Sequence, residues 1–184
     1  TDEGRHALGG GLLHSLGSML VMGSTVNSYK RYWDSGQFAP SKINWGLDNK
    51  TCTVRLSANG RLEFKLPDAA VNPYLSHAML ILACEDGLTN HIDPGAPTVG
   101  SSYDQGQDHR FPVLPLTLGD AITAFQQDAV LQAGLERLGG RCVINSVNFE
   151  DGDGPDSRFA KAMPLVKEHG TAVVVLAALT NALK

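Results

Sequence analysis

A carboxylate flanked by cations is the feature of this sequence best suited to chemistry. Glu63 lies between Arg61 and Lys65 in a segment where polar and apolar residues alternate, and residues 51–57 alternate in the same way. If the two segments pair as strands, Arg55 falls opposite Glu63. The carboxylate could then accept a divalent cation while the basic side chains take phosphate or carboxylate oxygens. The pattern is typical of a site that binds a metal-nucleotide together with an anionic substrate.

The loop at residues 58–60 decides how these two segments pair. A two-residue Asn-Gly turn would set Leu56 opposite Glu63 and mix the two faces. A three-residue loop with Gly60 in the left-handed conformation gives one consistent apolar face and sets Lys65 opposite Thr53. This register pairs Leu56 with Leu62, Val54 with Phe64 and Cys52 with Leu66.

We name the four charged side chains of this hairpin, Arg55, Arg61, Glu63 and Lys65, the charged hairpin face. An ordinary solvated strand face would carry the same residues, with cross-strand ion pairs that contribute less than about 1 kcal/mol each. From the pattern alone, this second interpretation is the more common one in proteins.

Helical periodicity and turn residues predict the other elements. The four glycines within residues 5–22 weaken that predicted helix, so neighbouring elements must hold it in place. In the last third, a strand, a helix and a strand predict a parallel crossover unit. The predicted helices are 5–22, 74–88, 118–132 (capped by Thr117) and 157–169; the strands are 142–148 and 171–176; residues 23–41 and 89–116 are predicted loops.

The composition excludes several classes of protein. The 184 residues are 42% hydrophobic and 18% charged, which is globular, and the net charge of -4 argues against general binding of nucleic acid or of an anionic membrane. No apolar run is long enough to span a bilayer, and three scattered cysteines favour a reducing compartment, so we expect a cytoplasmic protein. Because the chain starts without Met and ends near an apolar run at 173–179, we expect both ends to be truncated.

Several linked motifs resemble the glutamine synthetase family. They occur in that family's order and spacing from about residue 5 to 128, which corresponds to the carboxy-terminal part of its catalytic domain. The motifs read TVNSYKR (25–31), AP (39–40), WGLDNK (45–50), RLEFKLPD (61–68), NPYL (72–75) and LPLTL (114–118). The resemblance implies a ligase that uses ATP, through a γ-glutamyl phosphate, to join ammonia or an amine to glutamate.

The same resemblance implies roles for individual residues. Glu63 would ligate a catalytic Mg²⁺ or Mn²⁺, and Arg61 would approach the nucleotide phosphates. Arg31 and Lys65 would hold the carboxylates of glutamate. Lys50 and Arg55 would neutralise charge that develops on the phosphoryl group, in keeping with how phosphoryl transfer is catalysed.

Three positions depart from the family's pattern. Lys50 and Lys65 stand where the family commonly has Arg, and an ammonium group cannot form the bidentate fork of a guanidinium. Phe38 stands where many members have a Glu in a flap, a change that would favour an amine bulkier than ammonia. The family's other metal ligands lie upstream of the matched part, so we expect the isolated chain to be inactive or nearly so.

The tail resembles a different family. LERLGGRCVINSVN (135–148), EDGDGP (150–155) and SRFAK (157–161) are similar to the pterin-binding barrel of cobalamin-dependent methionine synthase. By this resemblance Asn145, at a strand end, would contact the pterin of methyltetrahydrofolate. Capping of a strand end is the alternative role for Asn145, because a few strands cannot close a barrel.

Together these observations predict an α+β chain in two parts. Residues 1–130 would form a fragment of a glutamine-synthetase-like catalytic domain, an antiparallel hairpin with packed helices, and residues 131–184 a short βαβ segment. The main functional expectation is an ATP- and Mg²⁺- or Mn²⁺-dependent ligase of nitrogen metabolism, acting on glutamate and ammonia or a small amine, as a homo-oligomer or with complementing chains. The alternatives are pterin binding by the tail and a non-catalytic structural or interaction fragment.

Overall fold

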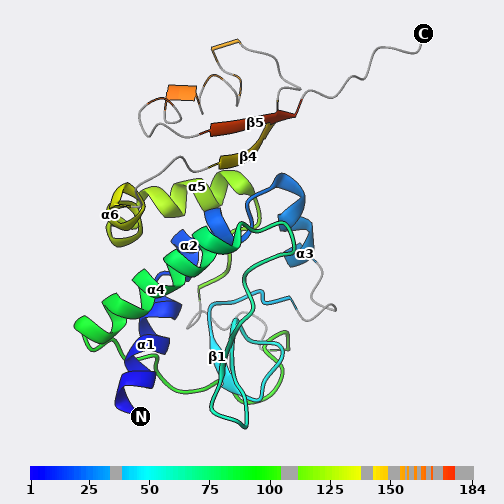
Figure 1. The fold of residues 1–184 in the computed structure, drawn as a ribbon. Coiled ribbons are helices and arrows are strands. Elements are labelled where there is room, and N and C mark those ends of the chain that lie inside the picture. Colours follow the sequence, from blue (N-terminus) through cyan, green and yellow to red (C-terminus); the bar gives the residue numbers. More distant parts are fainter. Residues whose placement is uncertain are drawn as a thin grey trace. The chain divides into compact units, whose positions relative to one another are not determined.

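The computed structural model describes most of the chain in two compact units. The described residues are 1–33, 39–104, 112–137, 143–148 and 172–176, together with 154, 155, 157, 160, 163, 164 and 167. The first unit comprises Thr1–Leu135 and the second Glu136–Lys184. The α+β fold class is confirmed: helices and a small sheet make up the first unit (Figure 1).

Four helices form the layer that supports the sheet of the first unit. α4 packs along α1, and α2 packs against α4 and α5 (Figure 1). Where α1 crosses α4, the two helix backbones approach each other so closely that a Cβ at Gly10 would lie 2.7 Å from the Cα of Gly87. The helices are α1 (Asp2–Leu13), α2 (Ser15–Met22), α4 (Pro73–Thr89) and α5 (Leu118–Gln126).

The predicted helix over 5–22 is in fact two helices, separated at His14. The predicted helix over 118–132 is also wrong as a single element, because α5 ends at Gln126 and α6 (Ala129–Arg137) follows. Asp128 makes this second break, since its Oδ1 accepts a hydrogen bond from the Leu131 N–H at 3.1 Å and so caps α6.

Two short helical elements occupy part of the predicted loop at 23–41. η1, a 3₁₀ turn (Val26–Tyr29), begins with a capping box in which Thr25 and Ser28 exchange side-chain and backbone hydrogen bonds. α3 (Lys30–Trp33) continues directly from it and buries Tyr32. These turns carry the predicted site residue Arg31, whereas Phe38 lies outside the described residues.

The predicted hairpin register is confirmed. β2 (Val54–Leu56) pairs antiparallel with β3 (Leu62–Phe64), with Val54 opposite Phe64 and Arg55 opposite Glu63. Gly60 has φ of +73°, the left-handed conformation that the three-residue loop requires. The apolar face is less uniform than predicted, since Leu62, near the hairpin tip, is 42% exposed.

A third strand, which the sequence did not predict, completes this sheet. β1 (Trp45–Leu47) pairs parallel with β2, in the strand order β1-β2-β3. The inner face of the sheet and the helices share one core, whose fully buried members include Met19, Val54, Leu66, Met79 and Leu131. The charged hairpin face therefore lies on strands whose opposite face packs against the buried core, which holds these strands in place.

The second unit contains the predicted parallel strand pair. β4 (Val143–Asn148) pairs with β5 (Ala172–Leu176), with Asn145 opposite Val174 and a register shift before Val147. Most of the helix predicted at 157–169 lies outside the described residues. In the described part of the chain, no helix combines the length and the hydropathy needed to cross a membrane.

Candidate functional site

The guanidinium of Arg55 is the centre of the charged hairpin face. Its Nη1 donates to Oε2 of Glu63 at 3.0 Å, and its Nε donates to Oδ1 of Asp48 at 2.9 Å. Its Nη2 donates to the same oxygen of Asp48. These hydrogen bonds raise the pKa of Arg55, the bond to Asp48 contributing most and the bond to Glu63 next. Arg55 is therefore a permanent cation held between two carboxylates.

Both carboxylates remain open to solvent. The side chain of Glu63 is 49% exposed and that of Asp48 59%, against 22% for Arg55. Ion pairs this exposed add little to stability because water and salt screen them. Their accessibility leaves Glu63 able to exchange Arg55 for another cation.

Lys65 extends the cluster toward the turn that follows β1. Its Nζ donates a hydrogen bond to the main-chain oxygen of Lys50, a residue with an exposed side chain. Burial lowers the pKa of Lys65, partly offset by the charge of Glu63; Arg31 and Arg55 lower it further. The charges of Glu63, Arg31 and Arg55 all act on the ammonium group of Lys65. Four of the predicted site residues therefore lie close enough to interact electrostatically at this end of the hairpin.

Arg31 reaches the same end of the hairpin from α3. Its Nη2 donates to the carbonyl of Lys65 at 2.8 Å, and its Nη1 donates to the carbonyls of Pro67 at 2.9 Å and Leu66 at 3.2 Å. The guanidinium also lies 5.3 Å from the centre of the Tyr32 ring. Arg31 thus ties the end of β3 to α3, so binding a substrate carboxylate would require it to release part of this main-chain contact.

The remaining predicted site residues lie at the edge of the cluster or outside it. Arg61, just before β3, has an exposed side chain, and by strand alternation it shares a face with Glu63 and Lys65. Asn145 belongs to β4 in the second unit, where its backbone pairs with Val174. The structure therefore brings six of the seven predicted residues to the hairpin and its surroundings, and Asn145 belongs to a separate unit.

Few side chains at the charged hairpin face could donate to a metal ion. Among the residues that the structure describes, no group of three His, Cys, Asp or Glu side chains could hold a metal. Glu63 can supply one oxygen ligand, and an ion such as Mg²⁺ commonly keeps several waters beside one or two carboxylates. The charged hairpin face fits one protein ligand of such an ion and does not form a complete metal site.

Asp48 is the functional residue that sequence reasoning missed. It occupies a left-handed conformation, with φ of +49°, immediately after β1. The parallel pairing of β1 with β2, which sets Leu47 opposite Leu56, brings this position beside Arg55. The available signal was a polar residue, Asp48, in a turn sequence before Asn49. That its partner is Arg55 became evident only from the pairing of β1 with β2.

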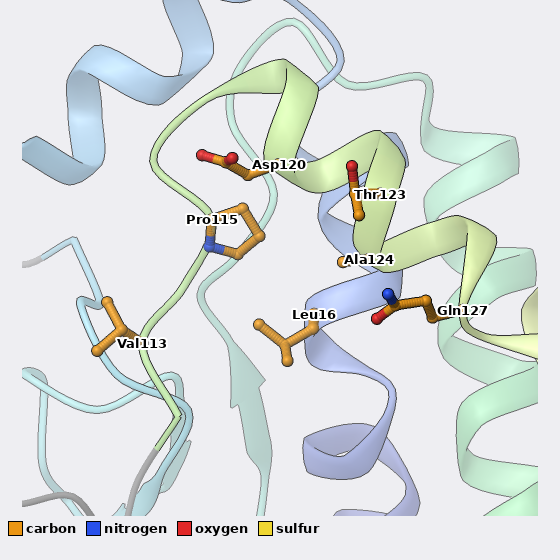
Figure 2. A pocket seen from close by; sticks show the side chains of 7 residues that line it. All are labelled: Leu16, Val113, Pro115, Asp120, Thr123, Ala124 and Gln127. Atoms are coloured by element: carbon orange, nitrogen blue, oxygen red, sulfur yellow. The ribbon is translucent and has the colours of Figure 1, made fainter.

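A separate shallow pocket of about 300 Å³ lies beside α5. Figure 2 shows Asp120, Thr123 and Ala124 of α5 on one side, with Leu16 of α2 and Pro115 on the other. Among the described residues that line it, none carries a basic side chain, so this part of its lining suits neither a nucleotide phosphate nor a glutamate carboxylate. The charged hairpin face remains the better candidate site.

The comparison with known families agrees with the motifs on this hairpin. The family described as "Glutamine synthetase, catalytic domain" matches residues 1–145. The chain belongs to this family. A glutamine synthetase of Rhizobium meliloti (strain 1021) is 40% identical over 143 residues, which are 73% of this chain and 32% of that protein. The chain thus spans about a third of the length of the curated glutamine synthetases that it matches.

Relatives that act on an amine are similar to the same extent. A glutamate–methylamine ligase of Methyloversatilis universalis is 37% identical over 139 residues, covering 71% of this chain and 31% of that protein. The solved structure "GmaS/ADP complex-Conformation 1" matches with a TM-score of 0.67 and 38% identity, over 73% of this chain and 32% of that chain. Similarity at this level supports the fold of the first unit independently of the motifs.

A shorter part of the chain matches another enzyme. A methionine synthase of Mycobacterium tuberculosis is 68% identical over 63 residues, which are 34% of this chain and 5% of that protein. The second resemblance stated from the sequence is therefore also confirmed, over a small fraction of methionine synthase.

Proposed function

We propose that the first unit is part of a glutamine-synthetase-like, ATP-dependent ligase that joins ammonia or a small amine to the γ-carboxylate of glutamate. One observation carries the proposal: in a chain of this family, Glu63 lies half-exposed and paired with Arg55 among further cations. An isolated surface ion pair would not require Arg31 and Lys65 to converge on the same strand end.

The proposed roles follow from where charge would develop. Arg61 and Arg55 lie on the side of the hairpin that carries Glu63, where they would bind the phosphates of ATP and neutralise charge during transfer. Lys50 and Lys65, joined through a main-chain oxygen, would act with them as point charges. Arg31 would orient the carboxylates of glutamate beside this phosphate site.

Glu63 is the proposed protein ligand for Mg²⁺ or Mn²⁺, which would supply positive charge at the phosphate oxygens. Glu63 is the one carboxylate of the charged hairpin face, and the remaining ligands would come from elsewhere in a larger catalytic domain. We therefore expect the isolated chain to bind nucleotide weakly and to have little or no activity, with activity arising in a homo-oligomer or with complementing chains in the cytoplasm.

The amine substrate is proposed from two observations. The matched relatives include a glutamate–methylamine ligase as well as glutamine synthetases. Phe38 brings an apolar side chain to the position where many family members carry a flap Glu. Both observations favour a small organic amine in addition to ammonia. A comparison of methylamine and ammonia as substrates of the chain assembled with its complementing chains would test this.

Calorimetry with Mg²⁺ and ATP tests the nucleotide site directly. We expect a heat of binding for the native chain that disappears in Glu63→Ala, because the variant loses the metal-binding carboxylate. Glu85→Ala is the matched control, since Glu85 is an exposed carboxylate on α4, and its binding heat should equal that of the native chain. Equal heats in both variants, or none in the native chain, would refute the proposal.

The methionine synthase match favours a second candidate function for the tail. There we propose a remnant of a pterin site, with Asn145 of β4 as a contact to methyltetrahydrofolate. The identity of 68% supports it, although the residues that the structure describes in the tail form one parallel strand pair, a small part of a barrel. A calorimetric titration with methyltetrahydrofolate should give a heat of binding that is lost in Asn145→Ala; a heat that this variant leaves unchanged would exclude the role.

A further inference from the structure

A histidine held between two carboxylates lies inside the first unit, away from the charged hairpin face. His14 occupies the break between α1 and α2, and its side chain is 7% exposed. Its Nδ1 lies 2.7 Å from Oδ2 of Asp128, and its Nε2 lies 2.9 Å from Oδ2 of Asp86. The two carboxylates are themselves mostly buried, at 12% and 18% exposure. We name these three residues the His14 cluster.

The cluster joins three elements that are far apart in the sequence. His14 belongs to the α1–α2 break, Asp86 to α4, and Asp128 to the turn between α5 and α6, all within the helical layer of Figure 1. The separations along the chain are 72 residues to Asp86 and 114 to Asp128. A change at His14 would therefore alter the packing of α2, α4 and α5 together.

Each carboxylate is held in place by its own helix. Oδ1 of Asp86 accepts a hydrogen bond from Nδ2 of Asn90 at 2.8 Å, and Oδ1 of Asp128 accepts one from the N–H of Leu131 at 3.1 Å. The oxygens that face His14 are therefore fixed acceptors, which cannot rotate away without breaking a second bond. A side chain at position 17 would also collide with Asp128, since a Cβ there would lie 2.8 Å from its Oδ2.

This geometry requires a particular protonation state. A neutral imidazole has one N–H, whereas the imidazolium has two. Two facing carboxylates are both satisfied only by the imidazolium, and in the neutral ring one carboxylate would meet a nitrogen lone pair. In the described part of the chain, the ionisable groups acting on His14 are Asp86 of α4 and Asp128 of the α5–α6 turn, both acidic.

The balance of forces agrees with this reading of the geometry. Burial alone lowers the pKa of His14, but the hydrogen bonds to Asp128 and Asp86 and their negative charges outweigh it, so the pKa is raised. A raised folded-state pKa stabilises the fold fully below the unfolded value of about 6.5, and this stabilisation is lost as pH rises through the folded value. The interaction that weakens is the contact of His14 with Asp86 and Asp128, which joins different helices.

We propose that the His14 cluster is a pH-sensitive latch within the helical layer: the protonated ring fastens α5 and the start of α6 to α2 and α4, and deprotonation releases them. The release consists of the loss of one hydrogen bond and the burial of an uncompensated carboxylate next to a neutral ring. The latch is independent of the proposed ligase activity, because none of its residues belongs to the charged hairpin face.

Nuclear magnetic resonance of the ring nitrogens tests the protonation state in the unmodified chain. Below the titration midpoint of the ring, both Nδ1 and Nε2 of His14 should carry a proton, and that midpoint should lie above about 6.5. Asp128→Asn should lower that midpoint while retaining an oxygen that can cap α6. A His14 midpoint at or below the unperturbed value would overturn the proposal.

Hydrogen exchange tests the release of α5. After correction for intrinsic rates, amide exchange in residues 118–131 should accelerate several-fold as pH rises through the His14 midpoint, while exchange in β2 and β3 stays constant. His14→Gln should remove this pH dependence, and His77→Gln, which changes an exposed histidine on α4, should retain it. Exchange in 118–131 that does not respond to pH in the native chain would overturn the latch, whether or not His14→Gln folds.

Discussion

Nη1 of Arg55 donates a hydrogen bond to Oε2 of Glu63 across the β2–β3 pair, at a distance of 3.0 Å. The two residues face one another because the strands are in the register that the three-residue loop imposes. A slip of one residue would turn Glu63 to the core side and bring an apolar residue opposite Arg55. The proposed ligand site therefore depends on loop geometry at Gly60 as much as on the charged residues themselves.

Replacing Glu63 should affect ligand binding and leave stability almost unchanged. The pair with Arg55 is half-exposed and screened by solvent, so Glu63→Gln should leave the thermal unfolding midpoint within error of the native value. Met79→Ala is the contrasting variant, because Met79 is fully buried and its truncation should cost about 2 to 5 kcal/mol. Scanning calorimetry compares the two; a large loss of stability in Glu63→Gln would assign Glu63 a structural role.

The close crossing of α1 and α4 should not accept a methyl group at position 10. A Cβ at Gly10 would meet the carbonyl of Ala83 and would lie 2.7 Å from the Cα and N of Gly87, all backbone atoms that cannot move aside. We expect Gly10→Ala to destabilise the fold by about 1 to 3 kcal/mol, or more if the helices must separate. Urea unfolding measures this loss.

Gly4→Ala is the matched control in the same helix. The nearest atom to a Cβ at position 4 is the Thr1 hydroxyl oxygen at 3.4 Å, an ordinary contact. Alanine should therefore gain up to about 1 kcal/mol of helix propensity. If Gly10→Ala were as stable as Gly4→Ala, the two helices could not cross as closely as the structure has them.

The elements that the sequence predicted well are those with local causes. α4 follows from apolar residues at helical spacing, such as Leu75, Met79 and Leu82, and the hairpin follows from alternation together with Gly60. Both signals lie within a few residues of the structure they determine. Their bounds and register could therefore be obtained without knowledge of the rest of the fold.

The elements that were missed depend on distant partners. The apolar stripe from Leu8 to Leu20 runs through the break at His14 without interruption, and the partners that fix this break lie 72 and 114 residues away. β1 has three residues, one of them Gly46, and no alternation, so only its pairing with β2 identifies it as a strand. The role of Asp48 was missed for the same reason.

Thr117 should contribute to stability as the cap of α5. Its Oγ accepts a hydrogen bond from the N–H of Asp120 at 3.1 Å and donates one to the carboxylate of that residue at 2.7 Å. We expect Thr117→Ala to cost about 1 kcal/mol in urea unfolding. Thr123→Ala is the matched control, because Thr123 lies exposed within the helix and alanine has the higher helix propensity. Equal effects of the two substitutions would contradict the capping role.

Tyr32 should set an alkaline limit to the stability of the first unit. Burial raises its pKa from 10.0 to about 12, although the Arg31 guanidinium acts in the opposite direction. The native chain therefore holds the phenol proton more tightly than the unfolded chain, so this contribution is complete below about pH 10 and is lost as pH rises toward 12. The loss should amount to about 2 to 3 kcal/mol over this range.

Tyr32→Phe separates this titration from other alkaline effects. The phenol donates to the carbonyl of Leu66, so the variant should lose about 1 kcal/mol near neutral pH. Above pH 10 its free energy of unfolding should fall less steeply than that of the native chain, because the titrating group is gone. Tyr74→Phe, at a side chain 85% exposed, should keep the native slope. If Tyr32→Phe and the native chain lost stability in parallel above pH 10, the phenol of Tyr32 would not be the group that sets the limit.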